Sequence, residues 1–141
     1  VTVIPFNSTG QVWLGKRLDN GLWNIVGGYY ELGDSAESCA RREVREEIGL
    51  EIKELTMFGV LTDPSVVRFT YPNGDEVQSP SHVFVAVLED GEVLADDEHS
   101  DFMWASLEEA RALVSRTTMG YSSTAFEMYA NWLQTKQFQI K

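Results

Sequence analysis

The chain has 141 residues and is acidic, because 22 Asp and Glu residues outnumber 11 Lys and Arg residues and give a formal net charge of −11. Such a charge, with no basic stripe to offset it, argues against binding to a nucleic-acid polymer or to a membrane surface. With 43% hydrophobic residues, the chain can build a core, so we interpret residues 1–141 as a single domain. Its apolar runs are too short to cross a bilayer.

The cellular setting is predicted from two features. The single cysteine, Cys39, cannot form an internal disulfide, which favours a reducing, cytoplasmic location. We also expect no secretion leader, because the first residues lack a charged segment followed by an apolar one. The sequence does not decide the oligomeric state, and a homodimer is one option.

Strands account for most of the elements outside one central helix. Apolar patterns predict extended segments at residues 1–6, 11–17, 51–61, 66–71 and 82–88. The dipeptide Asn73-Gly74 predicts a hairpin turn that returns through residues 76–78. Two later helices are predicted at residues 106–114 and 122–134. This order indicates an α/β (α+β) fold, in which a mixed sheet lies between helical layers.

The clearest helix is predicted from Ser35 to Ile48. Asp34 or Ser35 can cap its start, and Gly49 stands where a helix ends. Small or apolar residues recur every four positions along it, at Ala36, Ala40, Val44 and Ile48.

Three glutamates of this helix lie close together, although like charges at this spacing repel. With about 100° of rotation per residue, Glu43, Glu46 and Glu47 share an arc of about 100° beside the apolar stripe. Acids crowded at the edge of a core are unfavourable alone and favourable around hard divalent cations. Arg42 lies one turn before Glu46 and can hold it by a charged hydrogen bond. On this segment alone, a surface helix whose charges simply pair is an equal alternative.

The residues before the helix change that balance. Paired glycines, Gly27 and Gly28, let a backbone approach a ligand closely and leave carbonyl groups free to face a metal ion. Residues 28–50, GYYELGDSAESCARREVREEIGL, resemble the signature box of the Nudix hydrolases, Gx5Ex7REUxEExGU with U an aliphatic residue. The matching positions are Gly28, Arg42, Glu43, Val44, Glu46, Glu47, Gly49 and Leu50. Flanking segments extend the resemblance over about residues 1–115.

Two positions depart from the family pattern. Asp34 stands where the first glutamate of the box is usual, so this carboxylate is one methylene shorter. The family uses that position in a supportive role, so we expect weakened rather than absent activity. Val26 occupies a place that is often proline, which we expect to affect only the rigidity of the loop.

The resemblance implies an α/β/α sandwich and a hydrolase that cleaves a diphosphate linked to another group, typically in nucleotides, with Mg²⁺ or Mn²⁺. Glu43 and Glu47 would be the main metal ligands, Glu46 would share or orient that role, and the Gly27 carbonyl would complete the set. Arg42 would orient the glutamates. Such cations would neutralise the pyrophosphate, stabilise the leaving phosphate and lower the pKa of the attacking water.

The general base is predicted less sharply, because its position varies within the family. Glu98 is the first candidate and Glu46 the second. For Glu98, an equal alternative is a solvated loop acid beside Asp96 and Asp97.

Residues for substrate binding are the weakest prediction. Tyr30 follows the glycine pair and could contact the substrate, while Lys16 and Arg17 could meet phosphate oxygens or simply be solvated. The other aromatic candidates are expected to pack in the core: Trp13, Trp23, Tyr29, Phe69 and Tyr71. We interpret His82 and His99 as structural, and Cys39 as a packing residue rather than a nucleophile.

Two other functions stay open. A non-catalytic nucleotide-binding module would fit an eroded box, for which Asp34 is the sole support. An isopentenyl-diphosphate isomerase would share the fold, but the catalytic cysteine and glutamate that such enzymes need have no recognisable context in this sequence. The leading prediction is therefore a metal-dependent hydrolase of a nucleotide-type small molecule.

Overall fold

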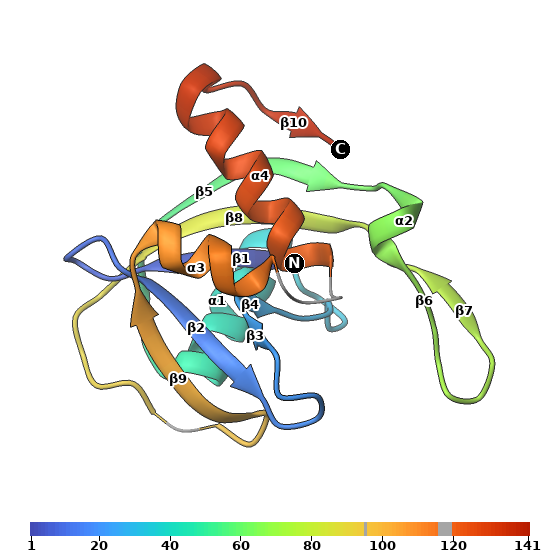
Figure 1. The fold of residues 1–141 in the computed structure, drawn as a ribbon, viewed down its shortest axis with the longest axis horizontal. Coiled ribbons are helices and arrows are strands. Elements are labelled where there is room, and N and C mark those ends of the chain that lie inside the picture. The colour runs from blue at the N-terminus through green and yellow to red at the C-terminus, as the bar shows by residue number, and fades with distance from the viewer. Residues whose placement is uncertain (95, 116–119) are drawn as a thin grey trace.

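A mixed sheet of eight strands forms the centre of the computed structural model, which describes residues 1–94, 96–115 and 120–141 (Figure 1). The strands run in the order β10-β5-β8-β1-β2-β3, while β4 pairs with β1 and β9 pairs with β2. Their bounds are β1 Thr2–Phe6, β2 Val12–Arg17, β3 Trp23–Asn24, β4 Val26–Gly27, β5 Ile52–Leu61, β8 Ser81–Leu88, β9 His99–Ala105 and β10 Gln139–Ile140. The pairs β1–β8 and β5–β10 are parallel and the other pairs are antiparallel, so the sheet is mixed as predicted.

Helices cover both faces of this sheet. Helix α1 (Ala36–Ile48) packs on one face, and α3 (Leu107–Val114) and α4 (Gly120–Thr135) pack on the other (Figure 1). Alternate strand residues face the two layers: Val3 and Trp13 lie with α1, whereas Ile4 and Leu14 lie with α3 and α4. The predicted sandwich is therefore confirmed. Among the described helices, none combines the length and the apolar character that a membrane crossing needs.

One predicted strand is partly wrong. Residues 66–71 were expected to be extended, but the short helix α2 (Pro64–Val67) takes up the first two of them, and β6 spans Arg68–Thr70. The Asp63 carboxylate accepts a hydrogen bond of 2.9 Å from the Ser65 backbone N–H, and proline suits the first helical position. The pattern also missed β3, β4 and β10, because two residues are too few to show a period.

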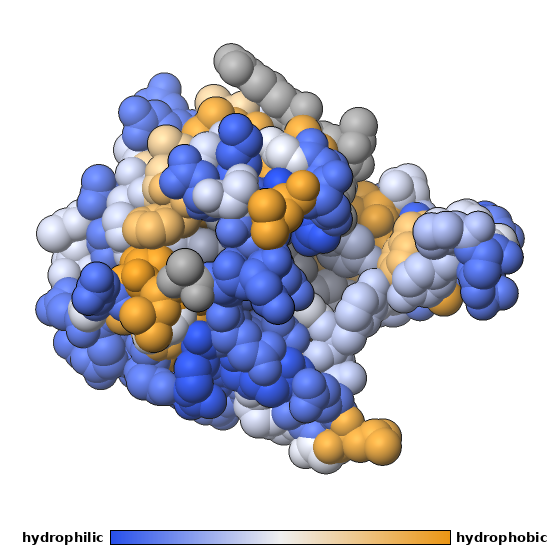
Figure 2. All heavy atoms as spheres, turned by 90° about the horizontal axis from the view of Figure 1, so that it is seen from below, coloured by the Kyte–Doolittle hydropathy of each residue, from blue (hydrophilic) through white to orange (hydrophobic). Residues whose placement is uncertain are grey.

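The predicted hairpin is present and stands away from the body. Strand β6 pairs with β7 (Glu76–Gln78) in antiparallel register, and the turn between them contains Gly74 with a φ of 92°. Figure 2 shows this projection from below, separated from the body by an open notch. The same view shows a mainly hydrophilic face on which apolar atoms form only small, separate areas.

Both ends of α1 are held as the sequence indicated. The Ser35 hydroxyl accepts from the Ser38 backbone N–H, and the Ser38 hydroxyl accepts from the Ser35 N–H, so the two serines cap each other. Gly49 adopts the left-handed conformation with a φ of 80°, and its N–H donates to the Arg45 carbonyl at 2.9 Å. The caps therefore fix where α1 begins and ends, and with it the positions of its glutamates along the helix axis.

Gly49→Ala is expected to lower the free energy of unfolding more than Gly74→Ala. Both glycines have positive φ, which costs an alanine about 1 kcal/mol. A Cβ at Gly49 would also lie 2.7 Å from the Leu94 Cβ, whereas nothing lies within 4 Å of one at Gly74. Urea unfolding of both variants measures the difference. Equal losses would show that Leu94 yields without cost.

Candidate active site

The three glutamates of α1 differ widely in exposure. The side chain of Glu46 is 56% exposed, that of Glu43 is 12% exposed and that of Glu47 is 4% exposed. The expectation that all three lie at the edge of the core is therefore wrong for Glu47, which is buried. Tertiary contacts enclose it, because the Gly27 N–H of β4 donates to its Oε2 at 3.1 Å and the start of β9 lies against its Oε1.

Glu43 packs directly against the backbone of Gly28. A Cβ built on Gly28 would lie 2.1 Å from the carboxyl carbon of Glu43, far inside van der Waals contact. A residue with a side chain at this position would push the carboxylate away. The first glycine of the box therefore has a local reason, which is to let the loop lie on the acid helix.

Arg42 ties the glutamates to the loop before the helix. Its Nη1 donates to Glu43 Oε1 at 2.8 Å and to Glu46 Oε2 at 3.3 Å. Its Nη2 donates to Asp34 Oδ2 and to the Tyr29 carbonyl, each at 2.8 Å. The hydrogen bond to Asp34, followed by that to Glu43, raises the pKa of the guanidinium, so this cation is permanent.

Asp34 thus anchors Arg42 in place of the longer acid that the box usually has. It also accepts hydrogen bonds of 3.0 Å from the Glu31 backbone N–H and from the Ser38 hydroxyl, which fix its carboxylate. The turn at residues 31–34 brings the shorter side chain within reach of the guanidinium. This departure from the family pattern therefore lies outside the group of crowded glutamates.

The opposite wall of the site comes from residues that the sequence analysis did not select. His99, at the start of β9, has a side chain that is only 4% exposed, and its Nε2 lies 3.6 Å from Glu47 Oε1. The Asp96 carboxylate lies 2.8 Å from His99 Nδ1, and Asn24 Oδ1 lies 3.2 Å from Nε2. The run of polar residues at 96–99, which leads into β9, is the signal that could have found Asp96 and His99.

Negative charge accumulates around the buried end of α1. Burial raises the pKa of Glu47 well above its usual value of 4.5, and the nearby charges of Glu43, Glu98 and Asp96 raise it further. Burial also raises the pKa of Glu43. Arg42 offsets this charge only in part, because it also pairs with Asp34. Concentrated carboxylates of this kind fit a divalent cation that prefers oxygen ligands.

The two general-base candidates are both exposed. Glu98 lies in the loop before β9, and its charge contributes to the raised pKa of both Glu43 and Glu47, which places it near them. Glu46 faces solvent beside Arg42.

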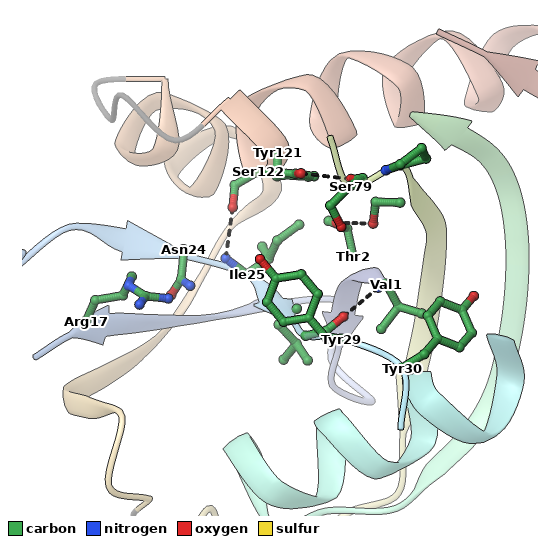
Figure 3. A pocket seen from close by; sticks show the side chains of 15 residues that line it. Val1, Thr2, Arg17, Asn24, Ile25, Tyr29, Tyr30, Ser79, Tyr121 and Ser122 are labelled. Carbon is green, nitrogen blue, oxygen red and sulfur yellow. Dashed lines mark hydrogen bonds between the residues drawn. The ribbon is translucent and has the colours of Figure 1, made fainter. Parts of the chain in front are cut away.

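A pocket of about 190 Å³ adjoins the acids and is shown in Figure 3. Gly27, whose N–H donates to Glu47, and Asn24, which contacts His99, both line this pocket, so the pocket meets the site there. Tyr29 and Tyr30 reach it from the loop before α1, while Tyr121 reaches it from α4 on the opposite side (Figure 3).

The predicted substrate residues are only partly assembled. Tyr30 lines the pocket, and its hydroxyl lies 2.6 Å from His82 Nδ1. Arg17 also lines the pocket, and its Nε donates to Asp19 at 2.8 Å. Lys16 is not among the lining residues, and its Nζ lies 6.0 Å from the centre of the Trp23 ring.

The aromatic residues divide between the core and the surface. Trp13 is buried in the core, as predicted. The prediction is wrong for Tyr29, which is 59% exposed, and for Tyr71, which is 42% exposed. Alternation cannot assign aromatics that lie in loops, because a loop has no regular period.

The profile of the NUDIX domain family matches residues 1–124. The chain belongs to the NUDIX family. It is 30% identical over 120 residues to an NAD-capped RNA hydrolase NudC of Photobacterium profundum, which covers 83% of this chain and 41% of the relative. It is 32% identical over 105 residues to a putative 8-oxo-dGTP diphosphatase of Bacillus subtilis, which covers 74% and 63% respectively. The chain thus matches about half of the length of these curated relatives.

A solved structure supports the fold of this NUDIX chain. It is a putative NUDIX hydrolase from Listeria monocytogenes, with a TM-score of 0.67 and 23% identity over 98% of this chain and 95% of the other. The family and the fold class that the box predicted are therefore confirmed.

Gly28→Ala is expected to weaken Mg²⁺ or Mn²⁺ binding by about tenfold or more, because the added methyl group must displace the Glu43 carboxylate. Titration calorimetry measures the affinity. Gly33→Ala is the matched control in the same loop, since a Cβ there meets nothing within 4 Å. Gly33→Ala should keep its cation affinity even if its positive φ lowers stability. Unchanged cation binding by Gly28→Ala would contradict the predicted role of Glu43 as a metal ligand.

Glu47→Gln is expected to stabilise the cation-free protein at about pH 8 and to leave it unchanged at about pH 4. The unfolded chain releases this proton near pH 4.5, whereas the folded protein keeps it to higher pH. The folded state therefore binds more protons in that window, and its stability falls as the pH rises through it. A gain of about 1 kcal/mol would raise the melting temperature by roughly 3 °C. A lower melting temperature at pH 8 would show that the carboxylate supports the fold.

Proposed function

We propose that this protein hydrolyses the pyrophosphate linkage of a nucleoside diphosphate derivative or a nucleoside triphosphate, with Mg²⁺ or Mn²⁺ bound at the acids of α1. The observation that carries the proposal is the buried carboxylate of Glu47 and the partly buried carboxylate of Glu43, beside a pocket lined by aromatic residues. Family membership and relatives that are named as a nucleotide diphosphatase and an NAD-cap hydrolase support it.

Four groups would hold the cations. They are the carboxylates of Glu43, Glu46 and Glu47 and the carbonyl of Gly27. Bound cations would supply charge neutralisation for the two phosphates and a lower pKa for the attacking water. Arg42 would keep Glu43 and Glu46 turned toward the site, because one guanidinium nitrogen donates to both.

A base must take the proton of the attacking water. We propose Glu98 for this role and keep Glu46 as the second candidate. Glu98 is exposed and its charge acts on Glu43 and Glu47, so it can reach solvent and the site together. Glu46 is second because its Oε2 already accepts a hydrogen bond of 3.3 Å from Arg42, which occupies one of its two oxygens.

The group attached to the diphosphate would enter the adjoining pocket. Tyr30 and Tyr29 offer ring faces beside the glycine pair. Arg17 lies where the pocket approaches the acids, so it would reach a phosphate oxygen by leaving Asp19. Lys16, which lies over Trp23, is a weaker candidate for a phosphate contact.

The two competing functions find less support. The departure at Asp34, which favoured a non-catalytic binder, affects the anchor of Arg42 and leaves Glu43, Glu46 and Glu47 in place. For an isomerase, Cys39 would be the candidate cysteine, but it is fully buried and burial raises the pKa of its thiol. Its Sγ faces the Tyr29 carbonyl at 3.4 Å, as a packing residue would.

Turnover by Glu47→Gln is expected to fall by at least about a hundredfold, because removal of one ligand charge weakens the hold on the cation. The assay measures the release of nucleotide products, and of phosphate or pyrophosphate, from a panel of nucleoside triphosphates and nucleoside diphosphate derivatives with Mg²⁺ and with Mn²⁺. Glu37→Gln is the matched control, since Glu37 lies on the same helix, is 65% exposed and pairs with Arg41.

The outcomes separate the candidate functions. Cation-dependent release by the native protein and by Glu37→Gln, but not by Glu47→Gln, supports the hydrolase. Nucleotide binding without release by any of the three would favour the non-catalytic module. Equal release by Glu47→Gln would refute the assignment of Glu47 as a ligand.

A further inference from the structure

His99 is held rigidly beside the acids, although the predicted ligand set does not include it. The Trp13 ring and the imidazole form a T-shaped contact, with a centroid distance of 5.3 Å and an interplanar angle of 83°. Gly15 leaves room for the ring, because a Cβ there would lie 2.4 Å from His99 Cδ2. The Asp96 carboxylate accepts from the His99 backbone N–H at 3.0 Å and lies 2.8 Å from Nδ1. The imidazole therefore has one orientation.

Three oxygen atoms converge on the two nitrogens of this ring. Asp96 Oδ2 faces Nδ1 at 2.8 Å, while Asn24 Oδ1 and Glu47 Oε1 face Nε2 at 3.2 Å and 3.6 Å. A neutral imidazole carries a single N–H, and in the tautomer that donates to Asp96 this N–H is on Nδ1. The lone pair of Nε2 then points at two oxygens. In this tautomer a cation between Nε2 and Glu47 Oε1 would meet an electron-pair donor atom on each side.

The geometry around Nε2 suits a metal ion. Ligand atoms of Glu47, Asp96 and His99 lie within 4.8 Å of one another, and all three side chains are at least nine-tenths buried. Two ligands that each lie about 2.1 Å from one ion are at most about 4.2 Å apart, so the 3.6 Å between Nε2 and Glu47 Oε1 can be bridged. A carboxylate on the other ring nitrogen is the usual support of a metal-binding histidine.

We propose that His99 Nε2 and Glu47 Oε1 form a mixed nitrogen and oxygen subsite that favours a first-row transition-metal ion, such as Mn²⁺ or Co²⁺, over Mg²⁺. Asp96 is the positioning residue that orients the imidazole. Imidazole suits transition metals, whereas Mg²⁺ prefers oxygen ligands in octahedral geometry. The inference rests on the proposed function, because it assumes that a cation binds at Glu47, and it adds which cation the site selects.

The rival explanation is that His99 only supports Glu47, either as an imidazolium or through packing. The two explanations differ in selectivity. A supporting residue affects Glu47 whichever cation it binds, so its loss should weaken Mg²⁺ and Co²⁺ by the same factor. A nitrogen ligand affects the transition metal alone, because Mg²⁺ makes little use of it.

The experiment compares the native protein with His99→Gln. Calorimetry with each metal alone should show Co²⁺ and Mn²⁺ binding weakened about tenfold or more in His99→Gln, with Mg²⁺ binding largely kept. Asp96→Asn should weaken Co²⁺ in the same direction while the imidazole remains present. Equal loss for all three metals would overturn the proposal in favour of a supporting role.

Pulsed electron paramagnetic resonance of the Mn²⁺-loaded native protein gives a second readout that needs neither turnover nor a folded His99 variant. Coupling to a ¹⁴N nucleus of an imidazole is expected. The sequence has two histidines, and His82, which bonds to Tyr30, provides the control: His82→Gln should keep the coupling. Bound Mn²⁺ without nitrogen coupling would overturn this inference and leave the proposed function standing, whereas no binding of any cation would refute the proposed function itself.

Discussion

The contact between the glycine pair and the acid helix is the constraint on which the site depends. Glu43 lies on the Cα of Gly28, and Glu47 accepts a hydrogen bond from Gly27, so the backbone of the loop covers two carboxylates at once. This cover removes water from both groups and raises the pKa of each. Removal of water disfavours the charged form of a carboxylate, and a nearby positive charge favours it. Positive charge at this position would therefore stabilise the ionised glutamates.

Arg42 supplies part of that charge from a fixed position. It connects the acids to Asp34 and to the Tyr29 carbonyl, so the loop and the helix share one guanidinium. Because Asp34 is drawn in by hydrogen bonds from Glu31 and Ser38, the shorter acid performs the anchoring task. The same loop carries Tyr29 and Tyr30 into the pocket, which couples the position of the acids to that of the pocket wall.

The sheet places His99 and Asn24, which form the opposite wall of the site, beside Glu47. Strand β9 pairs with β2, and the register sets Arg17 opposite His99, while Asn24 of β3 contacts His99 from the other edge of β2. Trp13 and Gly15, on β2, give the imidazole a ring to pack against and a gap to occupy. Residues that are far apart in the sequence therefore converge on Glu47 because three neighbouring strands hold them.

The sequence by itself determined the family, the layered fold, the acid helix and its caps, because these depend on local spacing and on a box of fixed positions within 23 residues. It selected Glu43, Glu46, Glu47 and Arg42 as candidate site residues for the same reason. Only the tertiary structure decided that Glu47 is buried, that Asp34 serves Arg42, and that Asp96, His99 and Asn24 surround Glu47. Helical periodicity predicts on which face of α1 a residue lies. The burial of Glu47 and the residues around it depend on strands that are distant in the sequence, and the local pattern does not predict how those strands pair.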